Sequence, residues 1–194
     1  MDMVRIAAGL TEDEFQASPR MFTNINSTSP LKHDWPMLDG AMRAARRGQV
    51  VVVSPFTLSG AMAPATVMGA VSQQTAEFPA ALVLLQAVRE GAPVVYGAFT
   101  SNVDMKSGAP AFGTPENSRA NMAGGQMARR YSLPYRTSAC NASNTVDPQS
   151  AHETQMALWG AVTGVGNLIY HAAGWLEGGL VASFEKLVLD VEML

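Results

Sequence analysis

Short apolar runs alternate with longer helical patterns along most of the chain. Four runs of apolar or β-branched residues predict strands at positions 50–53, 93–99, 133–138 and 167–171, and a weaker run lies at 21–26. A helical pattern follows each run, near positions 34–46, 64–89, 115–130, 148–162 and 180–194. The order β-α therefore occurs about five times, which is typical of an α/β protein.

Local signals mark where several of these helices begin. Thr114-Pro115 and Asp147-Pro148 each place a capping oxygen before a proline in the first helical turn. Pro79 lies inside the longest pattern, where its missing N–H is expected to kink or split the helix. The pair Gly124-Gly125 lies within another helical pattern, and we expect it to allow close packing against a neighbour.

The connections between the predicted elements are unequal in length. Helix-to-strand links are short, whereas the strand-to-helix links at 54–60, 100–114, 139–147 and 172–179 are long and chemically rich. Right-handed crossovers place every link that follows a parallel strand at the same end of the sheet. Barrel enzymes keep their chemistry at this carboxyl face, so we expect a functional site there.

Periodicity alone leaves two folds open, a TIM-type (β/α) barrel and a doubly wound open sheet. We expect the barrel. A complete barrel takes about 250 residues, so residues 1–194 are interpreted as one incomplete barrel domain. The two unpaired strand edges of such a domain predict a homo-oligomer or another cover for the edges.

Composition narrows the function classes. The chain is 47% hydrophobic and 15% charged, which allows a sizeable core, and its net charge of -3 provides no broad cationic surface. We therefore expect no nucleic-acid partner and interpret Arg46-Arg47 and Arg129-Arg130 as solvated helix ends. The single cysteine, Cys140, excludes an internal disulfide. Neither a signal peptide nor a spanning segment is visible, so a cytoplasmic protein without membrane contact is expected.

Several catalytic signatures are missing from the sequence. No Gly-Lys-Ser/Thr loop indicates nucleotide binding, and no Gly-x-Ser-x-Gly turn indicates a serine nucleophile. No lysine ends a predicted strand, which argues against the Schiff-base chemistry of a barrel lyase or aldolase. No residues are predicted to ligate a metal.

The loop after the last predicted strand combines three kinds of chemistry. His171, Trp175 and Glu177 place an imidazole, an indole and a carboxylate within a few residues of the strand end. An indole face attracts cations, and an aromatic cage with a nearby carboxylate suits a quaternary ammonium. Plainer interpretations stay open: His171 bonds the backbone of the next strand, Trp175 packs on the barrel rim, and Glu177 compensates a helix N-terminus.

Two other loops offer polar and aromatic groups to a ligand. In the loop at 101–116 these are Asn102, Asp104 and Phe112, although Asp104 could equally form a surface ion pair with Lys106. The loop at 140–147 is polar enough to line a site, and turn formation explains much of its composition equally well.

Two of these loop strings resemble the trimethylamine methyltransferase family. They are NVDMKSGAPAFGTPE, from Asn102 to Glu116, and HAAGWLEGGL, from His171 to Leu180. The pairs Ser54-Pro55, Gly60-Ala61 and Ala63-Pro64 and the segment 183–186 extend the resemblance, which covers the chain from about Pro30 onward. Chains of this family are usually much longer, so the sequence is interpreted as a mid-barrel segment.

The resemblance implies a TIM barrel that moves a methyl group from a methylated amine, such as trimethylamine or glycine betaine, to the cobalt of a corrinoid. This sequence has no Asp-x-His run, so the corrinoid is expected on a separate partner protein and not bound covalently here. The alternative is a catalytically inactive barrel fragment that self-associates and at most binds amines.

Roles for individual residues follow from the resemblance together with their chemistry. Trp175, with Phe112 or Tyr170, is expected to cage the substrate cation, and Asp104 or Glu177 to balance its charge. His171 and Asn102 are expected to orient the substrate or the corrinoid. Direct attack on a quaternary ammonium requires positioning more than acid–base catalysis, because the leaving group is a neutral amine.

Overall fold

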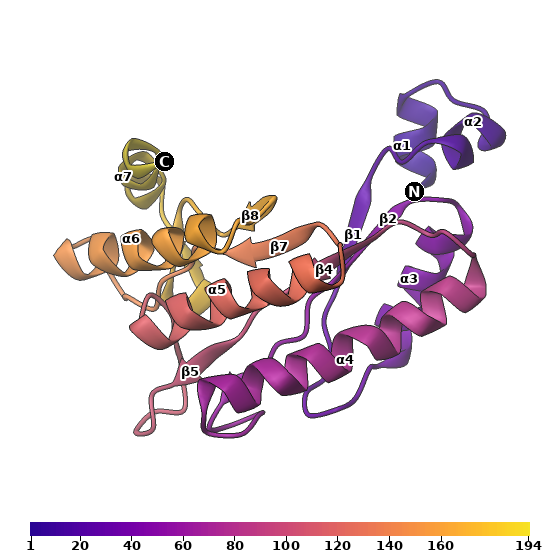
Figure 1. Ribbon diagram of the computed structural model, residues 1–194. Coiled ribbons are helices and arrows are strands. Elements are labelled where there is room, and N and C mark those ends of the chain that lie inside the picture. The colour runs from indigo at the N-terminus through magenta and orange to yellow at the C-terminus, as the bar shows by residue number, and fades with distance from the viewer.

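Five parallel strands form the main sheet of the computed structural model, which describes residues 1–194 (Figure 1). Their order in the sheet, β1-β2-β4-β7-β8, is also their order in the chain. The five strands predicted from the sequence are thereby confirmed, with these bounds: β1 Phe22–Ile25, β2 Val50–Val53, β4 Val94–Gly97, β7 Tyr135–Ser138 and β8 Leu168–Tyr170.

Four helices connect these strands and lie side by side along one face of the sheet: α3 (Trp35–Arg46), α4 (Val67–Val88), α5 (Pro115–Arg130) and α6 (Pro148–Thr163) (Figure 1). A doubly wound sheet would reverse its strand order and carry helices on both faces. Sequential order with one helical layer is instead the winding of a barrel. The sheet is a curled half-barrel, in which the rings of Phe22 on β1 and Tyr170 on β8, the two edge strands, lie 6.1 Å apart.

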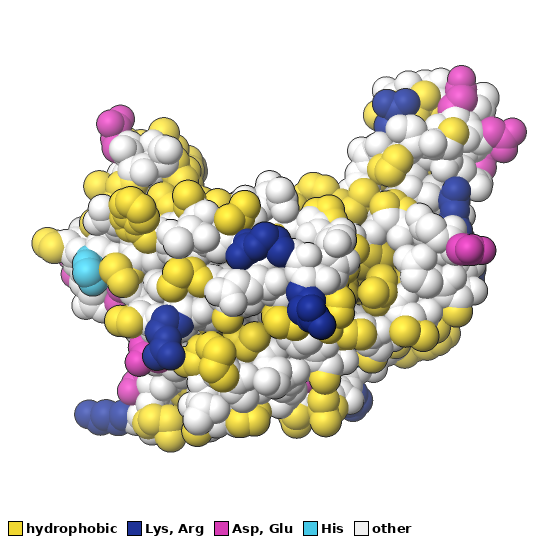
Figure 2. All heavy atoms as spheres, in the orientation of Figure 1, with side chains coloured by type: hydrophobic (Ala, Val, Ile, Leu, Met, Phe, Trp, Pro, Cys, Tyr) yellow, Lys and Arg dark blue, Asp and Glu magenta, His cyan; other side chains and the backbone are white.

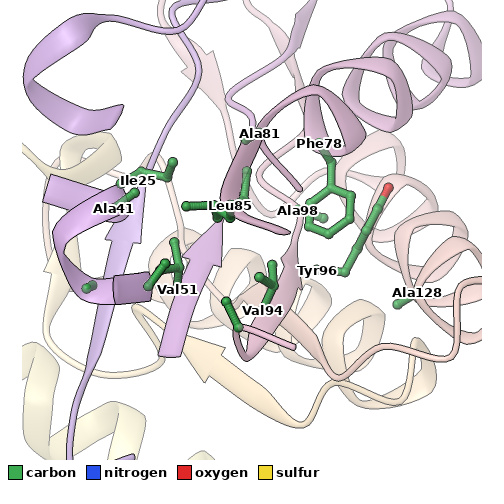
Figure 3. Close-up of a cluster of buried hydrophobic side chains, with 14 of the residues drawn as sticks. Ile25, Ala41, Val51, Phe78, Ala81, Leu85, Val94, Tyr96, Ala98 and Ala128 are labelled. Carbon is green, nitrogen blue, oxygen red and sulfur yellow. The ribbon is translucent and has the colours of Figure 1, made fainter. Parts of the chain in front are cut away.

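The core lies between the outer face of the sheet and the helices. Alternate strand residues such as Val51, Val53 and Tyr96 point toward the helices and pack against Phe78 and Leu85 of α4 (Figure 3). On the inner face of the sheet, at the amino ends of the strands, lies a hollow of about 300 Å³. Its lining includes Val50, Val52, Val95 and Leu168. Core packing and the inner surface therefore use opposite faces of the same strands.

The predicted helix starts are confirmed where a cap was visible. The side chains of Thr114 and Asp147 accept hydrogen bonds from the backbone N–H groups of Asn117 and Ser150, respectively. The expected close packing at Gly124-Gly125 is also confirmed. A Cβ on Gly125 would overlap the carbonyl of Gly164, the residue that follows the last turn of α6.

Two helix boundaries differ from the prediction. The helix expected from position 64 begins at Val67, after Thr66 caps it, and it continues through Pro79 as one helix, so a split there is wrong. The last helix, α7, runs from Phe184 to Met193 and not from Leu180. Ser183 caps α7, and the preceding residues form β10 (Val181–Ala182), which pairs with β9 (Trp175–Leu176).

The long links contain short elements that the sequence did not reveal. Strands β3 (Leu58–Ser59), β5 (Ser101–Val103) and β6 (Pro110–Ala111) form a small sheet after β2 and β4. A 3-10 turn, η1, spans Glu177–Gly179. Two helices near the N-terminus, α1 (Asp2–Ala7) and α2 (Glu12–Ala17), were also not predicted.

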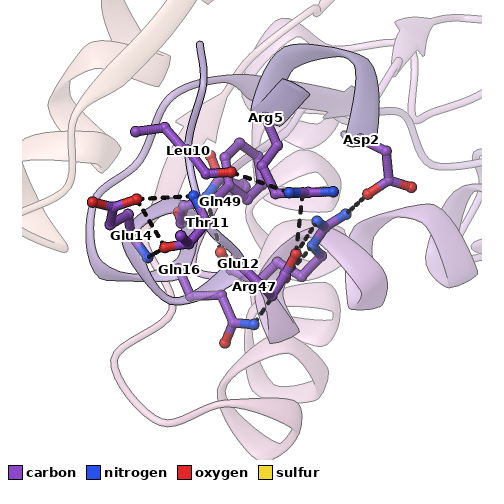
Figure 4. A network of polar contacts seen from close by, with 10 residues as sticks. Asp2, Arg5, Leu10, Thr11, Glu12, Glu14, Gln16, Arg47 and Gln49 are labelled. Atoms are coloured by element: carbon purple, nitrogen blue, oxygen red, sulfur yellow. Dashed lines mark hydrogen bonds and ion pairs between the residues drawn. The ribbon is translucent and has the colours of Figure 1, made fainter. Parts of the chain in front are cut away.

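A polar network attaches α1 and α2 to the loop that precedes β2 (Figure 4). Arg47 donates to Asp2 at 2.8 Å and, through Nε, to Glu12 at 2.7 Å, and its guanidinium lies 4.9 Å from the centre of the Phe15 ring. The interpretation of Arg47 as a solvated helix end is therefore wrong, because two carboxylates face it. The interpretation holds for Arg46, Arg129 and Arg130, which are exposed at the ends of α3 and α5, and Arg129 Nη1 also donates to the carbonyl of Gly164 at 2.9 Å.

The surface carries few charges. On the face shown in Figure 2, Lys and Arg side chains are scattered among uncharged and hydrophobic ones and form no continuous patch. Each helix is too short or too polar to span a bilayer.

Candidate functional site

Loops at the carboxyl ends of β2, β4 and β8 bring aromatic rings together. Phe99, just after β4, stacks on Phe112 with ring centres 5.3 Å apart and an angle of 6° between the planes. Phe56 contacts the Phe99 ring at 4.9 Å and His171 contacts it at 5.3 Å. The His171 ring lies 3.9 Å from that of Trp175. We call Phe56, Phe99, Phe112, Tyr170, His171 and Trp175 the aromatic cluster.

Polar side chains fix the loop that carries His171 and Trp175. Asn141 donates to the carbonyl of Trp175 at 2.7 Å and to Thr154 at 3.0 Å. On the other side of the loop, the Gly174 N–H donates to Asp190 of α7 at 2.9 Å, and Asp190 pairs with buried Lys186. The loop is therefore held from both flanks.

His171 is placed as a neutral ring. Burial, and secondarily the charge of Arg136, lower the pKa of His171 to about 4, so the imidazole is uncharged at neutral pH. Its Nδ1 is buried without a hydrogen-bond partner, and the alternative that His171 bonds the next strand is not realised. The residue has a φ of 59°, an uncommon value for a non-glycine residue that is found preferentially at functional sites.

Buried polar atoms without a partner concentrate at this end of the sheet. Native proteins pair nearly all such atoms, so a local group of exceptions indicates a place where a ligand or another group completes the bonding. The group consists of Arg136 Nε, Ser138 Oγ, Asn141 Oδ1, Tyr170 OH, His171 Nδ1 and Trp175 Nε1.

Arg136 lies on the inner face of β7, beneath the aromatic cluster. Its neighbour Tyr135 points to the helices, where its hydroxyl donates to the carbonyl of Asn121, so Arg136 points the other way. The guanidinium carbon of Arg136 lies 4.1 Å from the centre of the Tyr170 ring and 5.2 Å from that of Phe99. Desolvation lowers the pKa of Arg136 to about 10, which still leaves the group protonated at neutral pH.

The remaining predicted residues lie at the rim. Asp104 is exposed at the tip between β5 and β6, where its carboxylate accepts from Ser107 and the Lys106 N–H, and the surface ion pair with Lys106 is not formed. Hydrogen bonding to Ser107 lowers the pKa of Asp104. The Asn102 oxygen accepts from Thr114 at 2.7 Å. Glu177 is the acidic residue in the first turn of η1 and makes no side-chain hydrogen bond, and the residue that caps α7 is Ser183.

The structure thus brings together Trp175, His171, Tyr170 and Phe112 of the predicted residues, and it leaves Asp104 in a separate turn. Sequence reasoning missed Phe99 and Arg136. A usable signal existed for Arg136, since a charged residue in the middle of a buried strand is rarely buried without a reason.

Comparisons with known proteins agree on one family. The model of the family described as trimethylamine methyltransferase (MTTB) matches residues 1–194. A glycine betaine methyltransferase of Desulfitobacterium hafniense is 38% identical over 99% of this chain and 41% of its own length. A proline betaine:corrinoid methyltransferase of Eubacterium limosum is 33% identical over 90% of this chain and 36% of its own length. A trimethylamine methyltransferase of Methanosarcina mazei is 33% identical over the whole chain and 39% of its own length.

Proposed function

The chain belongs to the trimethylamine methyltransferase family, and we propose that the protein takes a methyl group from a methylated amine and delivers it to a corrinoid on a separate protein. The observation that carries the proposal is the aromatic cluster beside unpartnered polar atoms, at the end of the sheet where barrel enzymes bind substrates. The chain spans about two fifths of the length of these relatives (41%, 36% and 39%). The activity is therefore proposed for the whole protein of which this chain is a part.

The aromatic cluster suits a methylated ammonium. The rings of His171 and Trp175, at 3.9 Å, present π surfaces that attract a cation, and a neutral His171 adds no opposing charge. We propose that Trp175, with Phe112 or Tyr170, cages the cation. Glu177 is the better placed of the two carboxylates proposed to balance its charge, because it shares a loop with Trp175 and has no partner of its own.

Methyl transfer from a methylated ammonium requires little acid–base catalysis by the protein. The carbon–nitrogen bond breaks, its electron pair stays on nitrogen, and a neutral amine leaves without needing a proton. The residues bind and orient the substrate and exclude water; His171 and Asn102 are proposed to fix its direction. When bound, the corrinoid supplies a reduced cobalt that accepts the methyl group.

A corrinoid on a partner is consistent with the residues present. The chain has no Asp-x-His run of the kind that coordinates a corrinoid from below, His152 is exposed on α6, and His33 contacts the carbonyl of Glu77. The name of the Eubacterium limosum relative includes a corrinoid. We therefore propose that the corrinoid arrives on a separate protein.

The decisive assay mixes the protein with reduced cobalamin and a panel of methylated amines, and follows the cobalt spectrum as the methyl group transfers. We expect transfer from at least one amine. Amine binding in calorimetry without any transfer would instead support the alternative function, an inactive barrel segment that binds amines. The unpaired edges of β1 and β8 keep self-association as part of that alternative, testable by light scattering.

A further inference from the structure

Arg136 is a buried cation without a carboxylate partner. It is 2% exposed, it forms no ion pair, and the hydrogen bond it does make runs from Nη1 to the carbonyl of Ala98 at 3.3 Å. Its Nε is buried with no acceptor. The other buried cation, Lys186, has Asp190 beside it. Arg136 therefore lacks the negatively charged partner that a buried guanidinium normally has.

An unpaired buried charge is costly, and buried charges in folded proteins are normally paired. A guanidinium offers several N–H donors in a planar fork, whose best partner is the pair of oxygens of a carboxylate. The Nε of Arg136 and its neighbouring Nη belong to one edge of that fork. The site is therefore prepared for an anionic group on the inner face of β7.

The same charge makes the site unfavourable for a plain cation. Arg136 lies against the rings of Phe99 and Tyr170, and Phe99 also contacts His171, so a bound ammonium would lie close to the guanidinium. Two positive charges repel strongly in a poorly solvated site. A zwitterion avoids this repulsion, because its carboxylate lies between the two cations.

We propose that Arg136 anchors the carboxylate of the substrate and thereby selects a betaine, in which a short linker joins a quaternary ammonium to a carboxylate, over methylated amines without one. This inference rests on the proposed function and names the substrate class of the same site. The carboxylate binds Arg136 on β7, and the ammonium lies toward His171 and Trp175.

The test is calorimetric binding of glycine betaine, choline and tetramethylammonium to the whole protein. Choline replaces the carboxylate by a hydroxyl group and keeps the ammonium. Wild type is expected to bind glycine betaine at least about tenfold more tightly than choline. Arg136→Met should remove that preference and leave choline and tetramethylammonium binding equal or improved. Arg136→Lys should restore part of it, and Arg119→Gln, which removes an exposed arginine from α5, should change nothing.

Thermal melting without ligand separates a binding role from a structural one. If Arg136 awaits a ligand, Arg136→Met melts at the same temperature as wild type or higher, because an uncompensated charge is gone. A clear fall in melting temperature, with equal loss of all three ligands, would show that a carboxylate elsewhere in the protein pairs with Arg136 and would overturn the inference.

Failure of the inference and failure of the proposed function look different. Methyl transfer from tetramethylammonium or trimethylamine with no preference for glycine betaine would overturn the role of Arg136 and leave the function standing. Binding of glycine betaine through Arg136 without methyl transfer would overturn the function and leave the site. No binding of any methylated amine would overturn both.

Discussion

Two arginines at opposite ends of the sheet show how differently the same side chain is used. At the amino end, Arg47 faces the carboxylates of Asp2 and Glu12, and its hydrogen bond to Glu12 is the main reason that its pKa is raised. At the carboxyl end, Arg136 meets two aromatic rings and no carboxylate, and its pKa is lowered. We therefore expect the first arginine to stabilise the fold and the second to lower its stability.

The neighbours of each arginine follow the same division. Gln49, fully buried beside Arg47, accepts from the N–H groups of Arg20 and Met21 and donates to the carbonyls of Phe15 and Arg47. Around Arg136, the hydroxyl of Tyr170 has no partner. The comparison indicates that unpartnered buried polar atoms, more than burial itself, distinguish the end of this half-barrel that carries the candidate site.

The largest loss of stability is expected when the hydrogen bonds of Gln49 at the amino end are removed. Gln49→Ala leaves several buried backbone groups without partners and should lower the free energy of unfolding by about 3 kcal/mol or more. Denaturant unfolding measures this loss. Gln126→Ala, at an exposed position of α5, serves as the control and should change stability little. Equal effects of the two substitutions would contradict the division between the two ends.

A pH dependence should arise at the carboxyl end. The pKa of His171 is about 4 in the folded protein and near 6.5 when unfolded, so the unfolded state binds more protons between these values. Stability is therefore full above about pH 6.5 and is lost as the pH falls toward 4, by about 2 kcal/mol after allowing for partial exposure. The difference in melting temperature between wild type and His171→Phe should be constant above about pH 6.5 and should shift in favour of His171→Phe as the pH falls toward 4. A difference that stays constant over the whole pH range would refute the assignment.

A binding effect of moderate size is expected at Trp175. Trp175→Ala should weaken binding of glycine betaine by about 0.5–2 kcal/mol more than binding of 3,3-dimethylbutyrate, in which carbon replaces the charged nitrogen. Calorimetry with both ligands measures the difference. The matched control is Trp159→Ala, since Trp159 is 63% exposed on α6. Equal losses for the two ligands would exclude a cation cage.

The smallest effect should come from Arg47. Its ion pairs are partly solvated, so Arg47→Gln should cost less than about 1 kcal/mol, and the loss should shrink in high salt. Arg46→Gln, at an exposed neighbouring position, is expected to be neutral. Denaturant unfolding at two salt concentrations tests both. A loss that salt does not change would indicate that packing on Phe15, and not charge pairing, gives Arg47 its role.

The main elements were predictable because their signals are local. Four consecutive valines form β2, and Thr114 and Asp147 cap their helices through contacts three residues away. The segment from Leu180 to Ala182 was misassigned because β10 depends on pairing with β9, which no local pattern reveals. The helices α1 and α2 span six residues each, too few to show a helical period.

The site was predictable only in part, for a related reason. His171, Trp175 and Phe112 belong to loops whose composition is informative by itself. Phe99 and Arg136 are brought together by the curl of the sheet, which places the end of β4 and the inner face of β7 close to each other. The sequence alone predicted the loops of the candidate site, but it did not predict that Arg136 lies beneath them on the inner face of β7.

The sequential order of the strands also bears on how the chain reaches this shape. Each main strand pairs with the one before it in the chain, so every pairing can form as soon as the next strand has been synthesised. Each of these pairings closes a loop of a single βα unit, which costs less conformational entropy than pairing strands further apart in the chain. We therefore expect the half-barrel to assemble one βα unit at a time on the ribosome, with Arg136 covered only when β8 pairs with β7 and brings Tyr170 over the guanidinium.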